Sequence, residues 1–230
     1  MLVLELKLES EYINISTKDL NIWIIPAITS LSEALVLAAS KVLDIEFSDL
    51  KSGYRMRYEA DVIYVDIYLY DSLSSGAGYA NRVDNLIDEV MDEAEKRLRE
   101  CDCDSSCPKC LEHFWNQSIK PNLDRKTALE LLNWVRRGIL ERDIIADKEI
   151  KYISILNEIV NLQNNSYTII QKENSNWIEG NGMKKKIKIY PAMCSLNQIC
   201  DDKDAILIPD RLFKISLADV WKVVEQNLNF

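Results

Sequence analysis

Four of the chain's six cysteines crowd into ten residues, and this cluster constrains the fold more than any other feature of the sequence. They are Cys101, Cys103, Cys107 and Cys110, with the spacing C-x-C-x3-C-x2-C. Two close cysteine pairs can surround one Zn2+ with four thiolates while ordering little of the chain between them. Because the protein would fill all four positions of a tetrahedron, the pattern predicts one structural zinc ion rather than a catalytic one.

The same cluster has other interpretations. A set of reduced cysteines without metal, an iron–sulfur cluster and a redox-active C-x-x-C would all use such residues. His113, the single histidine, lies three residues after Cys110 and could replace one cysteine as a ligand. Cys194 and Cys200 lie far from the cluster in the sequence, and we expect them to be buried free thiols.

Charge limits the function classes that suit this chain. It has 28 Lys and Arg against 37 Asp and Glu, a net charge of −9, which argues against a free-standing, non-specific nucleic-acid binder. Local basic runs remain candidates for contact with a DNA backbone or an acidic partner, although such runs are commonly solvated faces. The candidates are Lys184, Lys185, Lys186, Lys188, Arg136 and Arg137.

The sequence also favours a cytoplasmic protein. The longest unbroken apolar run, residues 34–39, is far shorter than the ~20 residues of a membrane-spanning helix. The first residues mix apolar side chains with charges of both signs, unlike a signal peptide. Structural disulfides are rare in the cytoplasm, which again favours metal binding by the cysteines.

Hydrophobic periodicity predicts a mixed α/β (α+β) fold, with a small mixed sheet, flanking helices and the four-cysteine segment. Alternating or β-branched runs predict strands at 2–8, 62–70, 167–171, 187–190 and 205–208, with residues 22–25 as a short strand or loop. Helical spacing predicts helices at about 30–43 (opened by a Ser30–Glu33 capping box), 80–100 and 147–163, one after Asp124 and one after Ser216. The charged stretch 141–148 suggests two domains, 1–145 and a small α/β region, 146–230, packed on it.

A turn rich in Ser and Gly connects the strand at 62–70 to the helix that follows it. Gly76 and Gly78 suit a tight strand-to-helix turn, and Asp71 is then a turn or cap residue rather than a base. A phosphate-binding loop is the alternative, but the spacing matches neither nucleotide-binding fingerprint and no lysine follows.

Several of these pieces together resemble a known family. They are Asp71, Ser75–Tyr79, the four cysteines, Leu111, Asn116 and Leu123–Arg125, within roughly residues 1–140. The set resembles the MrfA-type zinc-binding domain, found at the C-terminus of MrfA-like superfamily 2 DNA-repair helicases. It also occurs in helicase-associated anti-phage proteins such as DrmB of DISARM and the large Druantia helicase. Ser75 and Ser106 stand where that family usually has glycine.

The resemblance implies a module that works with a DNA helicase. The chain has no G-x-x-x-x-G-K-[ST] loop and no Asp-Glu-x-His run, so it is not itself the motor. We therefore expect a non-catalytic, zinc-binding accessory module of a helicase or translocase complex in anti-phage defence or DNA repair. A helicase or ATPase, as a subunit or a domain, would be its partner and DNA would be reached through the complex. The alternatives are a structural scaffold between proteins, or a nuclease-like or ligand-binding enzyme using Asp201, Asp202 and Asp204.

Overall fold

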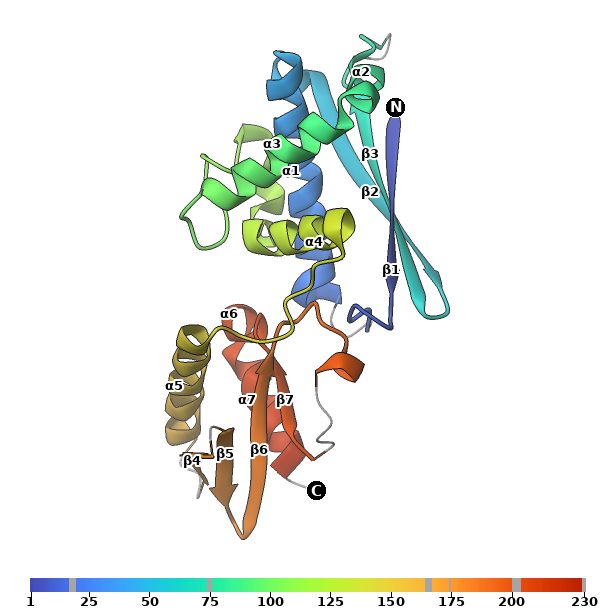
Figure 1. The fold of residues 1–230 in the computed structure, drawn as a ribbon. Coiled ribbons are helices and arrows are strands. Elements are labelled where there is room, and N and C mark those ends of the chain that lie inside the picture. The colour runs from blue at the N-terminus through green and yellow to red at the C-terminus, as the bar shows by residue number, and fades with distance from the viewer. Residues whose placement is uncertain (17–19, 74–75, 164–166, 174, 200–203, 229–230) are drawn as a thin grey trace. The chain divides into compact units, whose positions relative to one another are not determined.

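The computed structural model describes residues 1–230 except 17–19, 74–75, 164–166, 174, 200–203 and 229–230. The chain divides into two compact units, Met1–Leu140 and Glu141–Phe230 (Figure 1). Each unit has a small sheet of its own with helices beside it, so the predicted mixed α/β class is confirmed, with two sheets in place of one.

The sheet of the N-terminal unit is antiparallel, in the order β1-β3-β2. Its strands are β1 (Leu2–Glu9), β2 (Leu50–Glu59) and β3 (Val62–Asp71). Leu8 lies opposite Ile63 and Leu6 opposite Val65, so the alternating apolar residues of β1 and β3 share one face. These side chains are buried, and they form the sheet's part of the core.

Helices cover that face. The central one is α1 (Ile25–Leu43), and α3 (Ile87–Glu100) and α4 (Arg125–Arg137) both pack against it. The short α2 (Tyr79–Asn85) links β3 to α3, and a 3-10 stretch, Phe114–Asn122, precedes α4. The cysteine segment lies between α3 and this 3-10 stretch, so both of its ends are attached to helices that pack on the core.

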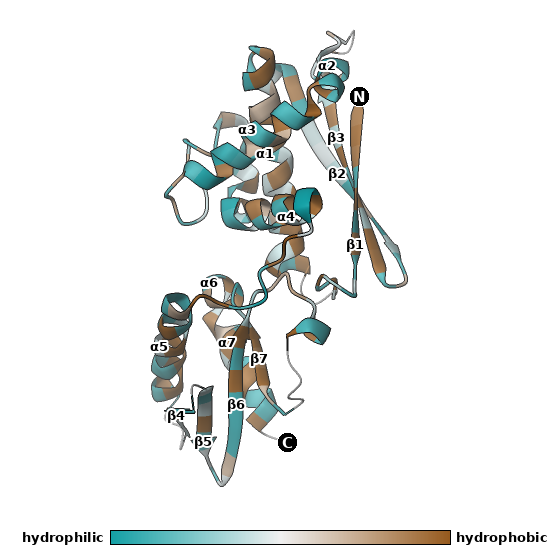
Figure 2. Ribbon diagram, in the orientation of Figure 1, coloured by the Kyte–Doolittle hydropathy of each residue, from teal (hydrophilic) through white to brown (hydrophobic). Residues whose placement is uncertain are grey.

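Residues 20–43 form the one described helix that is long and apolar enough to cross a membrane by length and composition. Of its most apolar window, 72% is buried inside the structure. Ala27, Ile28, Ala34 and Leu35 are among its fully buried side chains, and the hydropathy colouring shows this apolar character (Figure 2). Such burial is that of a core helix, which needs no membrane to cover it.

Three local predictions for this unit were wrong. Residues 22–25 belong to a π-helical turn, Leu20–Ile24, and to the first turn of α1, where Pro26 occupies an early position that needs no N–H donor. Ser30 is therefore inside the helix and does not cap it. The helix expected at 80–100 is broken at Leu86 into α2 and α3. Strand β2 was not predicted, and it pairs along the whole of β3.

The C-terminal unit holds a four-stranded sheet, in the order β4-β5-β6-β7. Its strands are β4 (Tyr167–Lys172), β5 (Ser175–Gly180), β6 (Met183–Tyr190) and β7 (Ile206–Pro209). The first three are antiparallel neighbours, whereas β6 and β7 are parallel. Helix α5 (Ala146–Leu162) contacts β4, α7 (Leu217–Leu228) contacts β7, and the short α6 (Leu212–Ile215) precedes α7.

Candidate metal centre

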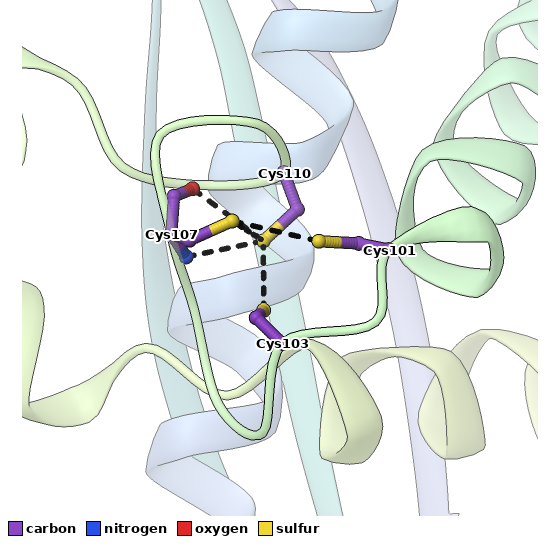
Figure 3. A group of neighbouring side chains, drawn as sticks. All are labelled: Cys101, Cys103, Cys107 and Cys110. Atoms are coloured by element: carbon purple, nitrogen blue, oxygen red, sulfur yellow. Dashed lines mark hydrogen bonds between the residues drawn. The ribbon is translucent and has the colours of Figure 1, made fainter.

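The four cysteine sulfurs converge at one point of the N-terminal unit (Figure 3). All four Sγ atoms lie within 4.8 Å of one another. The separation is 3.5 Å between Cys101 and Cys107, 3.6 Å between Cys103 and Cys110, and 3.9 Å between Cys107 and Cys110. None of these pairs is a disulfide.

These separations fit a tetrahedral zinc site. With Zn–S bonds of about 2.3 Å, the edges of a sulfur tetrahedron are about 3.8 Å long. The three sulfur separations of 3.5–3.9 Å match that edge, whereas a disulfide would need about 2.05 Å. The donor set is thus arranged for one ion held by four sulfurs, with no position left for water.

A knuckle turn supplies the second cysteine pair. The carbonyl of Cys107 accepts hydrogen bonds from the N–H groups of Cys110, Leu111 and Glu112, which closes the turn around Pro108. The N–H of Cys107 points at the Cys110 sulfur, with a nitrogen–sulfur distance of 3.3 Å. Such a bond stabilises a thiolate more than a neutral thiol, because the acceptor then carries the negative charge.

The thiols differ in acidity. Burial raises the pKa of the Cys110 thiol well above its usual range, whereas the backbone N–H of Cys103 lowers the pKa of Cys101 to about 7. Zinc binds thiolates, so loading this site releases protons and is opposed by acid.

Arg125 holds the first cysteine pair in place. Its Nε donates to the carbonyl of Cys103 at 2.7 Å, and its Nη1 donates to the carbonyl of Leu98 in α3 at 2.9 Å. Its own N–H bonds the carbonyl of Ser105 at 2.7 Å. Arg125 is 91% buried, so it connects the cysteine loop, the end of α3 and the start of α4. Leu123–Arg125 is part of the resemblance to the MrfA-type zinc-binding domain, but the sequence alone did not predict that Arg125 bonds the cysteine loop.

Asp124 begins α4 as predicted. Its carboxylate accepts from the N–H groups of Lys126 and Thr127, and its own N–H donates to the Ser30 hydroxyl in α1 at 2.7 Å. The cap thereby fixes where α4 begins relative to α1, and Arg125 follows it directly.

His113 is engaged away from the sulfurs. Its Nε2 lies 2.7 Å from a carboxylate oxygen of Glu33, and its Nδ1 accepts from the N–H of Trp115. The buried amide of Asn116 donates to the same Glu33 and to the carbonyl of Leu111, immediately after the last cysteine. Among the described residues, the group that could hold a metal consists of the four cysteines without His113.

The glycine-rich turn is organised by Asp71. Its two carboxylate oxygens accept from the N–H groups of Gly78 at 2.8 Å and Ala80 at 3.0 Å. Burial alone would raise the pKa of Asp71, but these two N–H groups hold it below its ordinary value. Gly76 and Gly78 have φ of +68° and +80°, which L side chains adopt only with strain. Ser75 lies outside the described residues.

Arg136 and Arg137, two candidate DNA contacts, lie at the end of α4 and face acidic residues of α3. Arg136 binds Asp92 and Glu95, and Arg137 binds Glu95. Together with Arg99, they make Glu95 the centre of an ionic cluster between the two helices. This pairing neutralises much of the charge that a DNA phosphate would use, and their contact with nucleic acid stays a prediction.

The lysine run lies on β6, in the other unit. Lys184 pairs with Glu179, and the Lys188 ammonium donates to the carbonyl of Ile199. Lys185 and Lys186 point to opposite faces of the sheet because side chains alternate along a strand.

The remaining predicted residues of this unit form no catalytic group that the structure describes. Cys194 is a buried free thiol, and burial raises its pKa. Cys200, Asp201 and Asp202 lie outside the described residues, and Asp204 is exposed in the turn before β7. A pocket of about 500 Å3 between α5 and the sheet has Glu149 as its one lining carboxylate, so it lacks the paired carboxylates of a metal-dependent nuclease.

Comparison with known proteins identifies the segment that carries the cysteines. Residues 31–111, which run from the second turn of α1 to the residue after Cys110, match the family model described as the MrfA Zn-binding domain. The matched segment contains all four cysteines of the candidate metal centre.

The comparisons also give two similar proteins, both much longer than this chain. The Druantia protein DruE of Escherichia coli (strain UMEA 4076-1) is 39% identical over 134 residues, which are 56% of this chain and 7% of DruE. The solved structure of the DUF1998 helicase MrfA bound to DNA is 19% identical, with a TM-score of 0.36, and the match covers 52% of this chain and 15% of that one. The chain therefore spans a small fraction of the length of either protein.

Proposed function

We propose that the N-terminal unit is a non-catalytic, zinc-stabilised module of a DNA helicase or translocase complex, in anti-phage defence or DNA repair. The observation that carries the proposal is the tetrahedral spacing of four sulfurs inside an MrfA Zn-binding domain. The four cysteines saturate the ion, so its contribution is to folding.

The zinc would fix the geometry of one surface. The cysteine loop is joined to α3 at Cys101, to α4 through Arg125, and to α1 through Asn116 and Glu33. Loss of the ion would release the loop that these contacts hold, and with it the ends of two helices. A rigid surface of this kind is what a motor domain needs for stable docking.

The partner would be an ATPase, encoded as a separate subunit or within the same polypeptide, and the complex would act in the cytoplasm. The match of residues 31–111 to the MrfA Zn-binding domain supports a helicase-associated role, because MrfA is a DUF1998 helicase. The 39% identity to the Druantia protein DruE over 134 residues supports a place within a much larger protein or complex. In this proposal DNA is reached through the assembled complex.

A direct test uses the purified chain with and without an MrfA-type helicase from the same organism. We expect the zinc-loaded chain alone to hydrolyse neither ATP nor DNA, and to bind the helicase and change its DNA-stimulated ATPase rate. The Cys107→Ser variant should lose zinc and helicase binding together. ATP hydrolysis that a point change in this chain abolishes, or helicase binding that Cys107→Ser leaves intact, would contradict the proposal.

A further inference from the structure

The C-terminal sheet has one face that carries most of the unit's lysine run. Strand alternation and the β4–β5–β6 register place a set of side chains together there, which we call the lysine face. Its members are Ile170, Lys172, Trp177, Lys184, Lys186 and Lys188. Trp177 is at its centre, directly opposite Ile170 on one side and Lys186 on the other.

The described helices α5 and α7 pack on the opposite face. Asn176 points to that side and donates to Glu149 of α5 at 3.0 Å. Ile178, Ile187 and Ile206 share that side and are buried, as expected for residues under helices. In Figure 1, α7 runs behind β6 and β7. The lysine face is thus the side of the sheet from which these two helices are absent, and the carbonyl of Ile199 contacts it at its Lys188 end.

Charge on the lysine face is positive within an acidic chain. It carries four lysines, and in the described parts of β4, β5 and β6 the acid on the same face is Glu179, paired with Lys184. Alternate residues of a strand lie about 6.6 Å apart, close to the spacing of successive phosphates in an extended polynucleotide. Lys184, Lys186 and Lys188 therefore form a row that follows the strand, and Figure 2 shows this part of β6 as hydrophilic.

Trp177 supplies an aromatic surface within this row. Its ring is partly buried, and the Lys184 ammonium lies 5.1 Å from the ring centroid. Its indole N–H is buried without a hydrogen-bond partner, so the ring can be held in place only by packing. Lys184 is a flexible, partly exposed side chain that can move from the ring to a phosphate.

We propose that the lysine face binds single-stranded nucleic acid, with one base stacked on Trp177 and the phosphates along Lys184 and Lys186. Aromatic stacking combined with a row of cations is how many proteins bind unpaired strands. The bases of a duplex are stacked on each other and cannot reach Trp177, so unpaired strands should bind more tightly. The inference rests on the proposed function only for the source of the strand, which a helicase would release.

The test measures binding of the full zinc-loaded chain to fluorescein-labelled dT20, U20 and a 20-base-pair duplex. We expect dT20 to bind at least tenfold more tightly than the duplex in low salt. The ratio of the dT20 and U20 affinities shows whether the face prefers single-stranded DNA or single-stranded RNA. Trp177→Leu should weaken dT20 binding by about tenfold, a size typical of losing one stacked base. Trp177→Phe, which keeps a smaller ring, should restore most of it.

The lysines offer a matched control within one strand. Lys186→Gln and Lys185→Gln remove the same charge from neighbouring residues, but only Lys186 is on the lysine face. Lys186→Gln should reduce the salt dependence of dT20 binding by about 0.7 in log–log slope, and Lys185→Gln should leave it nearly unchanged. Lys185 and Lys186 are both half-buried, and glutamine keeps most of the aliphatic stem, so this pair remains informative even if Trp177→Leu fails to fold.

Three results would overturn the inference: equal effects of Lys185→Gln and Lys186→Gln, duplex binding as tight as dT20 binding, or no dT20 binding in 50 mM salt. Competition by poly-glutamate that is independent of Trp177 would instead assign the face to an acidic protein. Zinc content is measured on the same samples. A chain that holds zinc but gives one of these results contradicts nucleic-acid binding by the lysine face, whereas a chain without zinc contradicts the proposed zinc module.

Discussion

At the scale of single residues, the metal centre depends on side chains outside the four cysteines. Arg125 satisfies carbonyls of Cys103 and Leu98 in a site where water has little access. Asn116 does the same for the carbonyl of Leu111. The sequence could mark these residues through family resemblance, but only the structure shows which carbonyls they meet, because the partners are 5 to 27 positions away.

Replacing Arg125 should destabilise the N-terminal unit. Arg125→Met removes the donors to the buried carbonyl of Leu98 and the half-buried carbonyl of Cys103, which costs about 1–3 kcal/mol in the free energy of unfolding. Lys126→Met is the matched control, since Lys126 is paired with the exposed Asp104 and such pairs contribute little. Chemical denaturation checks both variants, and an Arg125 effect no larger than that of Lys126 would be inconsistent with this role.

His113 provides a second prediction at this scale. Because Glu33 and the N–H of Trp115 occupy its two ring nitrogens, His113→Ala should retain one zinc per chain. Elemental analysis of the variant decides the point. Loss of the metal in this variant would mean that His113 is a zinc ligand in place of one of the four cysteines.

At the scale of elements, the sequence predicted those that carry a clean period and missed those that do not. β1 and β3 alternate strictly, and α4 has both an N-cap and an apolar stripe, so all three were found. β2 contains Gly53 and charged residues, and β5 is short and polar. β2 is stabilised by pairing along the whole of β3, and β5 by pairing with β4 on one side and β6 on the other. Sequence periodicity does not report such pairing.

The ionic cluster between α3 and α4 should make stability depend on pH. Arg137, with Arg99, lowers the pKa of Glu95 from 4.5 to about 2. A carboxyl group with a depressed folded-state pKa stabilises the fold above its unfolded pKa, and this contribution is lost as the pH falls from about 4.5 to 2.

Glu95→Gln should therefore lower the free energy of unfolding at pH 7 by about 1–2 kcal/mol, after allowing for the exposure of the arginines. The difference from the unsubstituted chain should shrink as the pH approaches 2. Urea titrations at several pH values measure it. A deficit that is constant with pH would mean that charge pairing is not the cause.

At the scale of the whole molecule, two units with separate sheets should unfold separately. The zinc site belongs to the N-terminal unit alone, so metal removal should act on one transition. With excess chelator under reducing conditions, calorimetry should show the N-terminal transition at a much lower temperature and the C-terminal one nearly unchanged. A single transition that shifts as a whole would indicate one cooperative molecule.

The central claim is that Cys101, Cys103, Cys107 and Cys110 hold one structural zinc ion, and X-ray absorption at the zinc edge, with elemental analysis of the purified chain, tests it most directly. Binding to four thiolates should contribute on the order of 10 kcal/mol to folding, so the ion should survive purification. We expect about one zinc per chain with four sulfur neighbours at about 2.3 Å. Absence of zinc, iron in its place, or a nitrogen or oxygen neighbour in the zinc shell would contradict it.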